Sequence, residues 1–442
     1  MKKLIIILIY ISSIYGQRVV GYYPEWVRPS HPESNLNLDV LTHIVHSFAY
    51  PNSSGEILVP NNFYDISISN VIHDGGGKLL LALGGWGQSE GFAPIAESKD
   101  LRKTFITNLL ALCDQYGYDG IDIDWEYPEN NVEKNNLNLL VYEMDSIFYQ
   151  HNNDLLITMA IPASGWKGQW FDFNFLKNYV DFFNVMTYDY HGSWSSHVGH
   201  NSPLYNSPSS DVEGSCHTGI NYLALTRQIP KNQLNMGVPF WGKLYNASNL
   251  NLPFDGSALD KWYSEIVDLV ESSNWDYYWD DIAKCPYLIN INNQQIITYD
   301  NPESIKEKCN YIIENELGGV MIWALGYDIV DGNQELINAI NDNYLGNDKL
   351  FNPDIPVEFD LKIFPNPFNP TVSIDLSMKV AEKVSISIFN INGEEVGLIY
   401  NGFLDIGNYV KQWEPIMKTS GIYFIKIQSE NFSKTKKIML IK

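Results

Sequence analysis

The chain has 442 residues, of which 45% are hydrophobic, and a formal net charge of −23. This length exceeds one typical domain and the apolar content can fill a large core, so we expect at least two folded units and no global disorder. The negative charge argues against nucleic acid and anionic membranes as partners, because both would repel the chain. A neutral substrate is the simpler expectation, and 28 Tyr, 20 Phe and 12 Trp offer flat faces for sugar rings or peptides.

Residues 1–16 are typical of a secretory signal peptide. Lys2 and Lys3 precede the apolar run LIIILIYI, and small or polar residues follow it. The run is short for a bilayer span, no cysteine follows it as a lipid anchor, and no later segment is long enough to be transmembrane. We therefore expect a mature monomer without a membrane span, secreted or held at the cell surface.

From Arg18 onward, short apolar runs alternate with helix-like stretches such as LRKTFITNLLALCDQYG, for which Gly117 is a plausible stop. Strands that alternate with helices predict a parallel sheet. Eight of them within about 320 residues fit a (β/α)8 TIM barrel. A doubly wound sheet is the alternative, but no G-x-G-x-x-G follows the first strand. We predict the barrel over residues 17–345.

Three regions depart from this rhythm. Residues 243–300 predict a small α+β insertion between the seventh and eighth strands, with two short strands after a helix over KWYSEIVDLVESS. Residues 346–360 are rich in Pro and Asn, which is typical of a linker. Residues 361–442 contain alternating strands and an N-G turn, so we expect a small all-β module.

Polar and aromatic residues cluster where the apolar runs end, and barrel enzymes carry their active sites there. In YDGIDIDWEYP, Asp122, Asp124 and Glu126 alternate with apolar residues. Strand alternation therefore places the three acids on one face, toward the barrel lumen. A solvated acidic edge strand would not interleave its acids with isoleucines. A Ca²⁺ or Mg²⁺ site is also disfavoured, because the spacing is not that of an EF-hand loop, and we expect no metal there.

Carboxylates crowded in a low-dielectric lumen cannot all ionise, so at least one keeps its proton near neutrality. Glu126 is outermost and is the natural general acid for cleavage of a glycosidic bond. Asp124 can hydrogen-bond to Glu126 or to a substrate, and Asp122 modulates the charge of Asp124. A carboxylate nucleophile would have to lie about 5 Å from the acid, and no other strand end offers an obvious Glu. This points to a substrate that supplies its own nucleophile, such as an N-acetyl group.

YDGIDIDWE resembles the signature D-G-x-D-x-D-x-E of glycoside hydrolase family 18, the chitinase family. The runs GYYPEW, HIVHSFAY, LLLALGGW, VMTYDY, MGVPFWGK and GGVMIWALGYD resemble family strands in the expected order, and the segment ending in IITYD resembles the chitinase insertion domain. The resemblance covers about Arg18 to Tyr344. It implies a secreted chitinase that acts on chitin or chitooligosaccharides without a cofactor. An endo-β-N-acetylglucosaminidase acting on N-glycans or peptidoglycan, and a non-catalytic chitin-binding lectin, remain as alternatives.

The resemblance also implies roles for single residues in a retaining, substrate-assisted mechanism. Glu126 would protonate the scissile oxygen, while Asp124 would orient the 2-acetamido group, whose carbonyl oxygen attacks the anomeric carbon. Tyr188 would donate its hydroxyl to that carbonyl, and Asp122 completes the catalytic set. Substrate contacts are implied for residues spread over several strand ends: Tyr22, Phe48, Gly85, Trp86, Tyr127, Met186, Asp189 and Trp323.

Two positions depart from the family pattern. Ala82 replaces a serine whose hydroxyl, with that of Tyr22, is expected to stabilise charge on Asp122, so the pH optimum is in question. Lys243 stands where an arginine is frequent, which would alter a hydrogen bond to sugar. Trp166 and Trp194 are either further sugar platforms or packed loop residues.

The last 82 residues resemble the type A C-terminal sorting domain of type IX secretion, through FPNPFNP, GIYF and a Lys-rich end. The resemblance implies an immunoglobulin-like β-sandwich and the secretion machinery as a partner; a carbohydrate-binding β-sandwich is the alternative. Four cysteines, Cys113, Cys216, Cys285 and Cys309, show no C-x-x-C spacing, so we expect no zinc site built on them. Disulfides and free buried thiols both remain open for these four.

Overall fold

The structure, a computed structural model, describes residues 17–345 except 153, 271 and 273, and residues 359–441 except 367, 379–380, 391–394, 406, 416–417 and 430–432. The predicted signal peptide and most of the predicted linker lie outside the described residues. Internal contacts divide the chain into two units, Met1–Asn347 and Asp348–Lys442.

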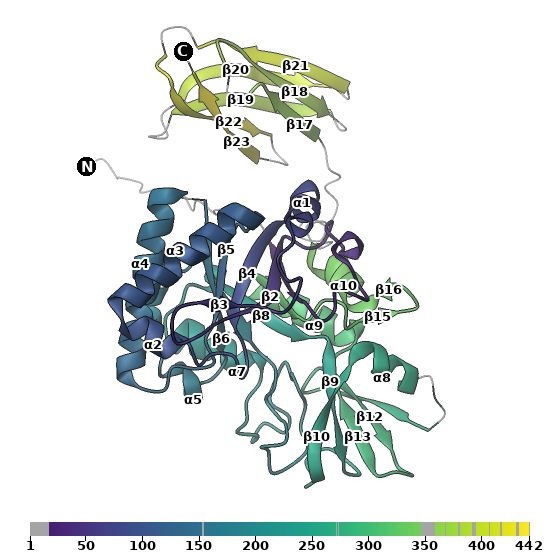
Figure 1. The fold of residues 1–442 in the computed structure, drawn as a ribbon. Helices are drawn as coiled ribbons and strands as arrows, with labels where there is room; N and C mark the ends of the chain where they lie inside the picture. Colours follow the sequence, from purple (N-terminus) through teal and green to yellow (C-terminus); the bar gives the residue numbers. More distant parts are fainter. Residues whose placement is uncertain are drawn as a thin grey trace, which may run out of the picture. The chain divides into compact units, whose positions relative to one another are not determined.

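Eight parallel strands form a closed barrel in the first unit (Figure 1). Each strand pairs with the next one along the chain, and the first strand pairs with both the second and the last, which closes the barrel. The predicted TIM barrel is therefore confirmed. Its strands are β1 Arg18–Pro24, β2 His43–Pro51, β4 Lys78–Gly84, β5 Gly120–Asp124, β6 Leu156–Pro162, β7 Phe182–Met186, β8 Leu234–Pro239 and β14 Gly319–Trp323.

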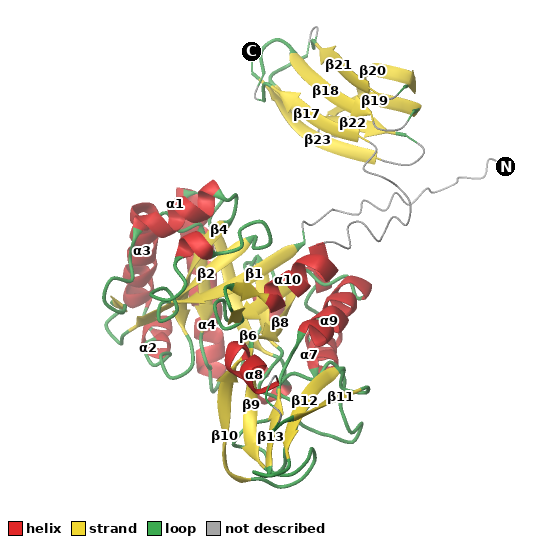
Figure 2. Ribbon diagram, turned by 90° about the vertical axis from the view of Figure 1, so that its right-hand side faces the viewer, coloured by secondary structure: helices red, strands yellow, loops and turns green. Residues whose placement is uncertain are grey.

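Helices pack around the barrel (Figure 2), and local sequence sets their ends. The helix α3 begins after Ser98, whose side chain accepts a hydrogen bond from Leu101 N, and it ends at Gly117, which has a φ of 72° as the predicted stop requires. Among the described residues, no helix has both the length and the apolarity that a membrane crossing needs. The helices are α1 Ile66–Asp74, α2 Phe92–Glu97, α3 Lys99–Tyr116, α4 Asn131–His151, α5 Gly165–Gly168, α6 Phe173–Leu176, α7 Cys216–Asn221, α8 Tyr263–Val270, α9 Pro302–Glu314 and α10 Glu335–Ile340.

Short elements connect or extend the longer strands and helices of this unit. They are the strands β3 Ile57–Leu58, β15 Ile329–Val330 and β16 Asn333–Gln334, the 3-10 helices η1 Glu33–Asn35 and η3 Lys231–Gln233, and the π-helices η2 Tyr222–Thr226 and η4 Asn341–Leu345.

The barrel has two separate apolar cores because side chains alternate along each strand. Ile121, Ile123 and Trp125 belong to the outer core, which packs beneath the helices. The lumen has a smaller core of its own, to which Tyr22 and Ala82 contribute. The acids of β5 therefore face inward while their neighbours face the helices, as the alternation predicts.

An antiparallel sheet with the strand order β10-β9-β13-β12-β11 is inserted between β8 and β14. Three strands follow α8, whereas the sequence predicts two. Two tight turns divide this run, and Lys284 and Gln294 adopt positive φ angles of 55° and 49° there, without the Asn-Gly pair that would signal a turn. The strands are β9 Trp241–Asn246, β10 Asp255–Trp262, β11 Asp276–Asp280, β12 Cys285–Asn290 and β13 Gln295–Thr298.

The second unit contains two antiparallel sheets, ordered β17-β18-β21 and β20-β19-β22-β23. Inward-facing residues of both sheets, such as Ile374, Ile386 and Ile425, form one apolar core. The predicted all-β module is confirmed. Its strands are β17 Phe359–Phe364, β18 Val372–Met378, β19 Glu382–Asn390, β20 Glu395–Leu404, β21 Gly407–Trp413, β22 Gly421–Gln428 and β23 Ser433–Leu440.

All four cysteines are buried and unpaired. Of the two possibilities that the sequence leaves open, the structure therefore favours free thiols. Burial raises the pKa of Cys113 and Cys309 to about 12, so neither is a reactive thiolate at neutral pH.

Candidate active site

The three acids of the YDGIDIDWE motif lie at the carboxyl end of β5, at graded depths. Asp122 is fully buried and Asp124 is 5% exposed. Glu126 lies two residues beyond the end of the strand and is half-buried. The column therefore runs from the barrel interior to its mouth, which is the face where TIM barrels carry catalytic groups.

Asp122 is held by three donors from three other strands. Tyr22 of β1 donates to its Oδ2 at 2.7 Å, Asn184 of β7 donates to its Oδ1 at 3.1 Å, and the Thr158 hydroxyl of β6 donates to the same Oδ1. Burial raises the pKa of Asp122, and these three hydrogen bonds oppose the rise.

Ala82 and Thr158 flank Asp122 in the sheet, since Asp122 pairs with Ala82 on one side and with Thr158 on the other. Ala82 of β4 has no hydroxyl, but Thr158 supplies one from β6, at the position paired with Asp122 on the other side. Neither Thr158 nor Asn184 was predicted as a site residue from the sequence, although strand alternation places both on the lumen side.

Asp124 has an oxygen, Oδ1, that is buried and has no hydrogen-bond donor from the described protein. Burial raises its pKa well above the ordinary value, and the negative charges of Glu126 and Asp122 raise it further. An uncompensated acceptor in a buried site costs about 1–3 kcal/mol. Such an atom is placed to receive an N–H or O–H from a bound molecule.

Glu126 is held by its backbone. Its N–H donates to Ser89 Oγ at 3.0 Å, and the same hydroxyl lies 3.2 Å from the carbonyl oxygen of Asp124. Burial raises the pKa of Glu126 to about 7; the nearby charge of Asp189 also raises it, whereas a hydrogen bond with Tyr127 lowers it. A carboxyl with this pKa is protonated often enough near neutrality to serve as an acid. Ser89 lies in a loop whose sequence gave no sign of this role.

Aromatic rings converge at the mouth, around Trp323 at the end of β14. Phe48 stacks on it with centroids 5.5 Å apart, and Tyr22 meets it edge-on at 5.6 Å. Trp26, which the sequence analysis missed, contacts it at 6.3 Å and is 52% exposed. A Cβ at Gly85 would lie 3.0 Å from the Phe48 ring, so only glycine leaves this wall undisturbed.

Tyr188 follows β7, which lies two strands away from β5 in the barrel. Its ring packs edge-on against Trp241 at 4.9 Å, and its hydroxyl lies 3.9 Å from Met321 Sδ. Burial raises the pKa of Tyr188 well above its ordinary value and the charge of Asp124 raises it further, so the hydroxyl stays a proton donor. Met186, at the end of β7, packs against the apolar core of the barrel lumen, to which Tyr22 and Ala82 also belong.

Comparison with protein families decides the affiliation of the first unit. Residues 18–328 match the family described as Glycosyl hydrolases family 18. The chain belongs to this family. Residues 362–442 match a second family, described as the Secretion system C-terminal sorting domain.

Relatives of this family 18 chain are named chitinases. "Probable chitinase 10" of Drosophila melanogaster is 30% identical over 352 residues, which is 70% of this chain but 15% of that protein. Chitinase 1 of Aphanocladium album is 30% identical over 264 residues, covering 56% of this chain and 60% of the relative. The chain thus spans less than two thirds of either relative.

Solved structures of chitinases have the same fold as the first unit. The Group IV chitinase of Ostrinia furnacalis matches with a TM-score of 0.69 and 27% identity, over 75% of this chain and all of that one. A structure of this chitinase in complex with allosamidin matches with a TM-score of 0.68 and 28% identity, over 74% of this chain and 98% of that one.

The second departure from the family 18 pattern, Lys243 of β9, is bound to protein carboxylates. Its Nζ lies 2.7 Å from Asp189 Oδ1 and 2.7 Å from Asp260 Oδ1. Burial alone would lower the pKa of Lys243. The two carboxylates have the larger effect, and the pKa of Lys243 is raised above its ordinary value. Lys243 thereby connects the insertion sheet to the loop after β7, where Asp189 adopts a φ of 58°.

The remaining predicted contact residues, and the two tryptophans left open as sugar platforms or packed loop residues, lie in loops and in the short helix α5. Trp86, in the loop after β4, is 78% exposed, and Trp166 and Trp194 are 68% and 63% exposed. The Tyr127 ring lies 6.3 Å from that of Trp166. Large exposed rings on one rim of a barrel suit the apolar faces of sugars.

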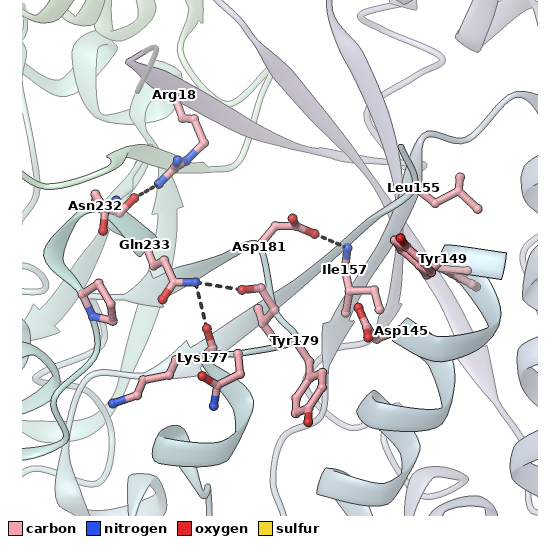
Figure 3. Close-up of a pocket in the computed structure, with 14 residues that line it drawn as sticks. Arg18, Asp145, Tyr149, Leu155, Ile157, Lys177, Tyr179, Asp181, Asn232 and Gln233 are labelled. Atoms are coloured by element: carbon pink, nitrogen blue, oxygen red, sulfur yellow. Dashed lines mark hydrogen bonds between the residues drawn. The ribbon is translucent and has the colours of Figure 1, made fainter. Parts of the chain in front are cut away.

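A cavity of about 580 Å³ lies at the other end of the family 18 barrel, lined by the first residues of β1 and β6 and by the segments that lead into β7 and β8 (Figure 3). Its polar groups serve the backbone: Asp181 Oδ2 accepts from Ile157 N at 2.8 Å, and Gln233 Nε2 donates to the carbonyls of Lys177 and Val180. Groups at this end of a TM barrel typically serve stability.

Proposed function

We propose that this protein is an exported chitinase that hydrolyses β-1,4 bonds between N-acetylglucosamine units, with retention of configuration. The orphaned Oδ1 of Asp124 carries the proposal. This oxygen is a buried acceptor beside the carboxyl groups of Asp122 and Glu126, whose pKa values are raised. An acetamide N–H of a bound sugar is the donor that would satisfy it.

In this mechanism Glu126 gives its proton to the glycosidic oxygen as the bond to the anomeric carbon breaks. The carbonyl oxygen of the 2-acetamido group attacks that carbon and forms an oxazolinium ion. Asp124 receives the amide N–H, and Tyr188 donates its hydroxyl to the attacking carbonyl. Water then attacks the anomeric carbon and opens the oxazolinium ring, while Glu126, now ionised, removes a proton from that water.

A carboxylate nucleophile is the competing route, and Asp189 is the candidate because its charge acts on Glu126. Asp189 is bound to Lys243 at 2.7 Å and lies in the loop after β7, with its side chain 43% exposed. Its charge is therefore already compensated, which favours the acetamide as the nucleophile.

The substrate class is supported by the walls of the site. Trp323, Phe48 and Trp26 offer ring faces for sugars, and the insertion sheet adds Trp262, stacked on Tyr327 at 4.4 Å and 40% exposed. A family 18 chitinase from Cycas revoluta, 25% identical to this chain, was solved in complex with (GlcNAc)4. An extended aromatic rim suits a polymer better than the single branched glycan that an endo-β-N-acetylglucosaminidase would take.

The sorting domain supports export as the setting. Its family match and the signal-like first 16 residues are consistent with an enzyme delivered to the cell surface or medium. The partners of the whole chain would then be chitin and the type IX secretion machinery.

The test compares the wild type with Glu126→Gln on chitooligosaccharides, following product anomers by NMR. We expect the wild type to release the β-anomer first, and Glu126→Gln to lose about 10²–10⁴-fold in kcat. Glu129→Gln, which changes an exposed carboxylate three residues away, is the matched control and should keep full activity.

Other outcomes would contradict the proposal in distinct ways. Equal rates for wild type and Glu126→Gln would remove Glu126 from the mechanism. A first-formed α-anomer would exclude the acetamide route. Cleavage of N-glycans or peptidoglycan but not of chitooligosaccharides would identify the alternative glucosaminidase, and binding without cleavage would identify a lectin.

A further inference from the structure

We propose that His191, His197 and Asp211 form a binding site for a divalent transition-metal ion of the zinc class. All three lie in the long loop between β7 and α7. Their candidate ligand atoms lie within 4.8 Å of one another. This cluster shares no residue with the acid column or with the four cysteines, at both of which the sequence predicts no metal site.

The distances fit a site that is close to its metal-bound geometry. Asp211 Oδ2 lies 3.0 Å from His191 Nε2 and 3.7 Å from His197 Nε2. Donors bound to one tetrahedral Zn²⁺ at about 2.0–2.1 Å are themselves separated by about 3.3 Å. An ion can thus contact all three atoms after small side-chain adjustments.

His191 is oriented as a ligand should be. Its Nδ1 lies 3.0 Å from the carbonyl oxygen of His200, and a carbonyl can only accept, so Nδ1 carries the proton. Nε2 is then left to offer its lone pair to the cluster, an arrangement that metal-binding histidines commonly show. Gly199 packs directly against the ring, since a Cβ at this position would come within 2.3 Å of it.

The second observation is that His191 Nε2 is buried and has no hydrogen-bond partner, although Asp211 Oδ2 is only 3.0 Å away. The two side chains are 1% and 2% exposed. A simple ion pair would be expected to form the hydrogen bond that is missing here. A cation bound between the nitrogen and the oxygen would satisfy both atoms.

Asp211 is anchored independently of the histidines. Its Oδ1 accepts the N–H of Glu213 at 3.0 Å, and its backbone carbonyl accepts Asn206 Nδ2 at 2.7 Å. One carboxylate oxygen is thereby fixed and the other is free to bind the ion. Two imidazoles and one carboxylate suit Zn²⁺ and its neighbours rather than Ca²⁺ or Mg²⁺, which take oxygen ligands.

A metal here would close a loop whose two ends, His191 and Asp211, lie 20 residues apart in sequence. The tight turn between the histidines carries the exposed Trp194, and its Ser193 is hydrogen-bonded to Ala258 of the insertion sheet. An ion would therefore fix the base of a turn that projects an aromatic side chain beside the active-site rim.

The test uses the mature full-length chain, produced without a polyhistidine tag, stripped with a chelator and dialysed against Zn²⁺ or Co²⁺. We expect one Zn²⁺ per chain by elemental analysis, a visible Co²⁺ spectrum of four-coordinate type, and a higher Tm with Zn²⁺ than with chelator. His197→Gln and Asp211→Asn should each weaken binding at least about tenfold.

His151→Gln is the matched control, because His151 forms a surface pair with Asp114 at 2.9 Å and should not affect binding. Should Asp211→Asn fail to fold, His197→Gln decides the result, since the His197 side chain is 25% exposed. Absence of saturable Zn²⁺ binding, or equal binding by wild type and His197→Gln, would overturn the site. The measurement needs no sugar substrate, so it is independent of the proposed hydrolase activity.

Discussion

Glu126 must carry a proton to act as the acid, and burial raises its pKa to about 7. We expect kcat/KM to fall about tenfold per unit of pH above that value, as the acid ionises.

The raised pKa of Glu126 also affects stability: the folded protein holds this proton more tightly than the unfolded chain, in which the pKa of Glu126 stays near 4.5. The stabilising contribution is present at low pH and is lost as the pH rises toward 7. Glu126→Gln should therefore melt higher than wild type at pH 8 but not at pH 4. Identical melting temperatures at pH 8 would contradict the raised pKa.

Thr158 supplies a hydroxyl to Asp122 from the neighbouring strand β6, whereas Ala82 has no hydroxyl to offer from β4. Thr158→Val keeps the shape but removes one of three donors, so we expect the free energy of unfolding to fall by about 1–3 kcal/mol. The pKa of Asp122 should rise further, and the pH–rate profile should move with it. Ala82→Ser added to Thr158→Val restores a hydroxyl from the other side, at the position paired with Asp122. Stability and pH profile should then recover together; recovery of neither would show that the Thr158 hydroxyl is not what tunes Asp122.

At the scale of elements, Lys243 connects the insertion sheet to the loop after β7 through its ion pairs with Asp260 and Asp189. Lys243→Met removes the cation that compensates Asp189, and the unpaired negative charge should raise the pKa of Glu126. We expect the basic limb of the pH profile of kcat/KM to move to higher pH. Lys261→Met is the control, since Lys261 lies on the same sheet and pairs with Glu265. An unmoved limb in Lys243→Met would show that Asp189 does not act on Glu126.

At the scale of the whole molecule, each of the two units has an apolar core of its own. Because the residues of the candidate active site named above all lie in the first unit, a chain ending at Asn347 should keep kcat on chitooligosaccharides within about twofold. The same truncation should abolish export in a host with type IX secretion. Calorimetry of the full mature chain should resolve two transitions, and only the one for the barrel should survive truncation. Loss of activity on truncation, with the barrel still folded, would contradict this division.

Local sequence was sufficient wherever one strand or one turn decides the outcome. The period of two along β5 places Asp122 and Asp124 in the lumen and Ile121 and Ile123 beneath the helices. Gly117 ends α3 because a left-handed residue is needed there. The order of strands and helices, with the family signature, was enough for the barrel, the insertion and the C-terminal β module.

Tertiary structure alone decided which groups meet. Asp122 receives donors that lie 36, 62 and 100 residues away in sequence. The Ser89 hydroxyl reaches the backbone of Glu126 because β4 and β5 pair side by side and bring together the segments that follow them. His191 comes to lie beside Asp211 because the long loop between β7 and α7 folds back on itself. Alternation along one strand determines the face on which a side chain lies, but its partner depends on the register of neighbouring strands and the path of loops, which only the folded chain fixes.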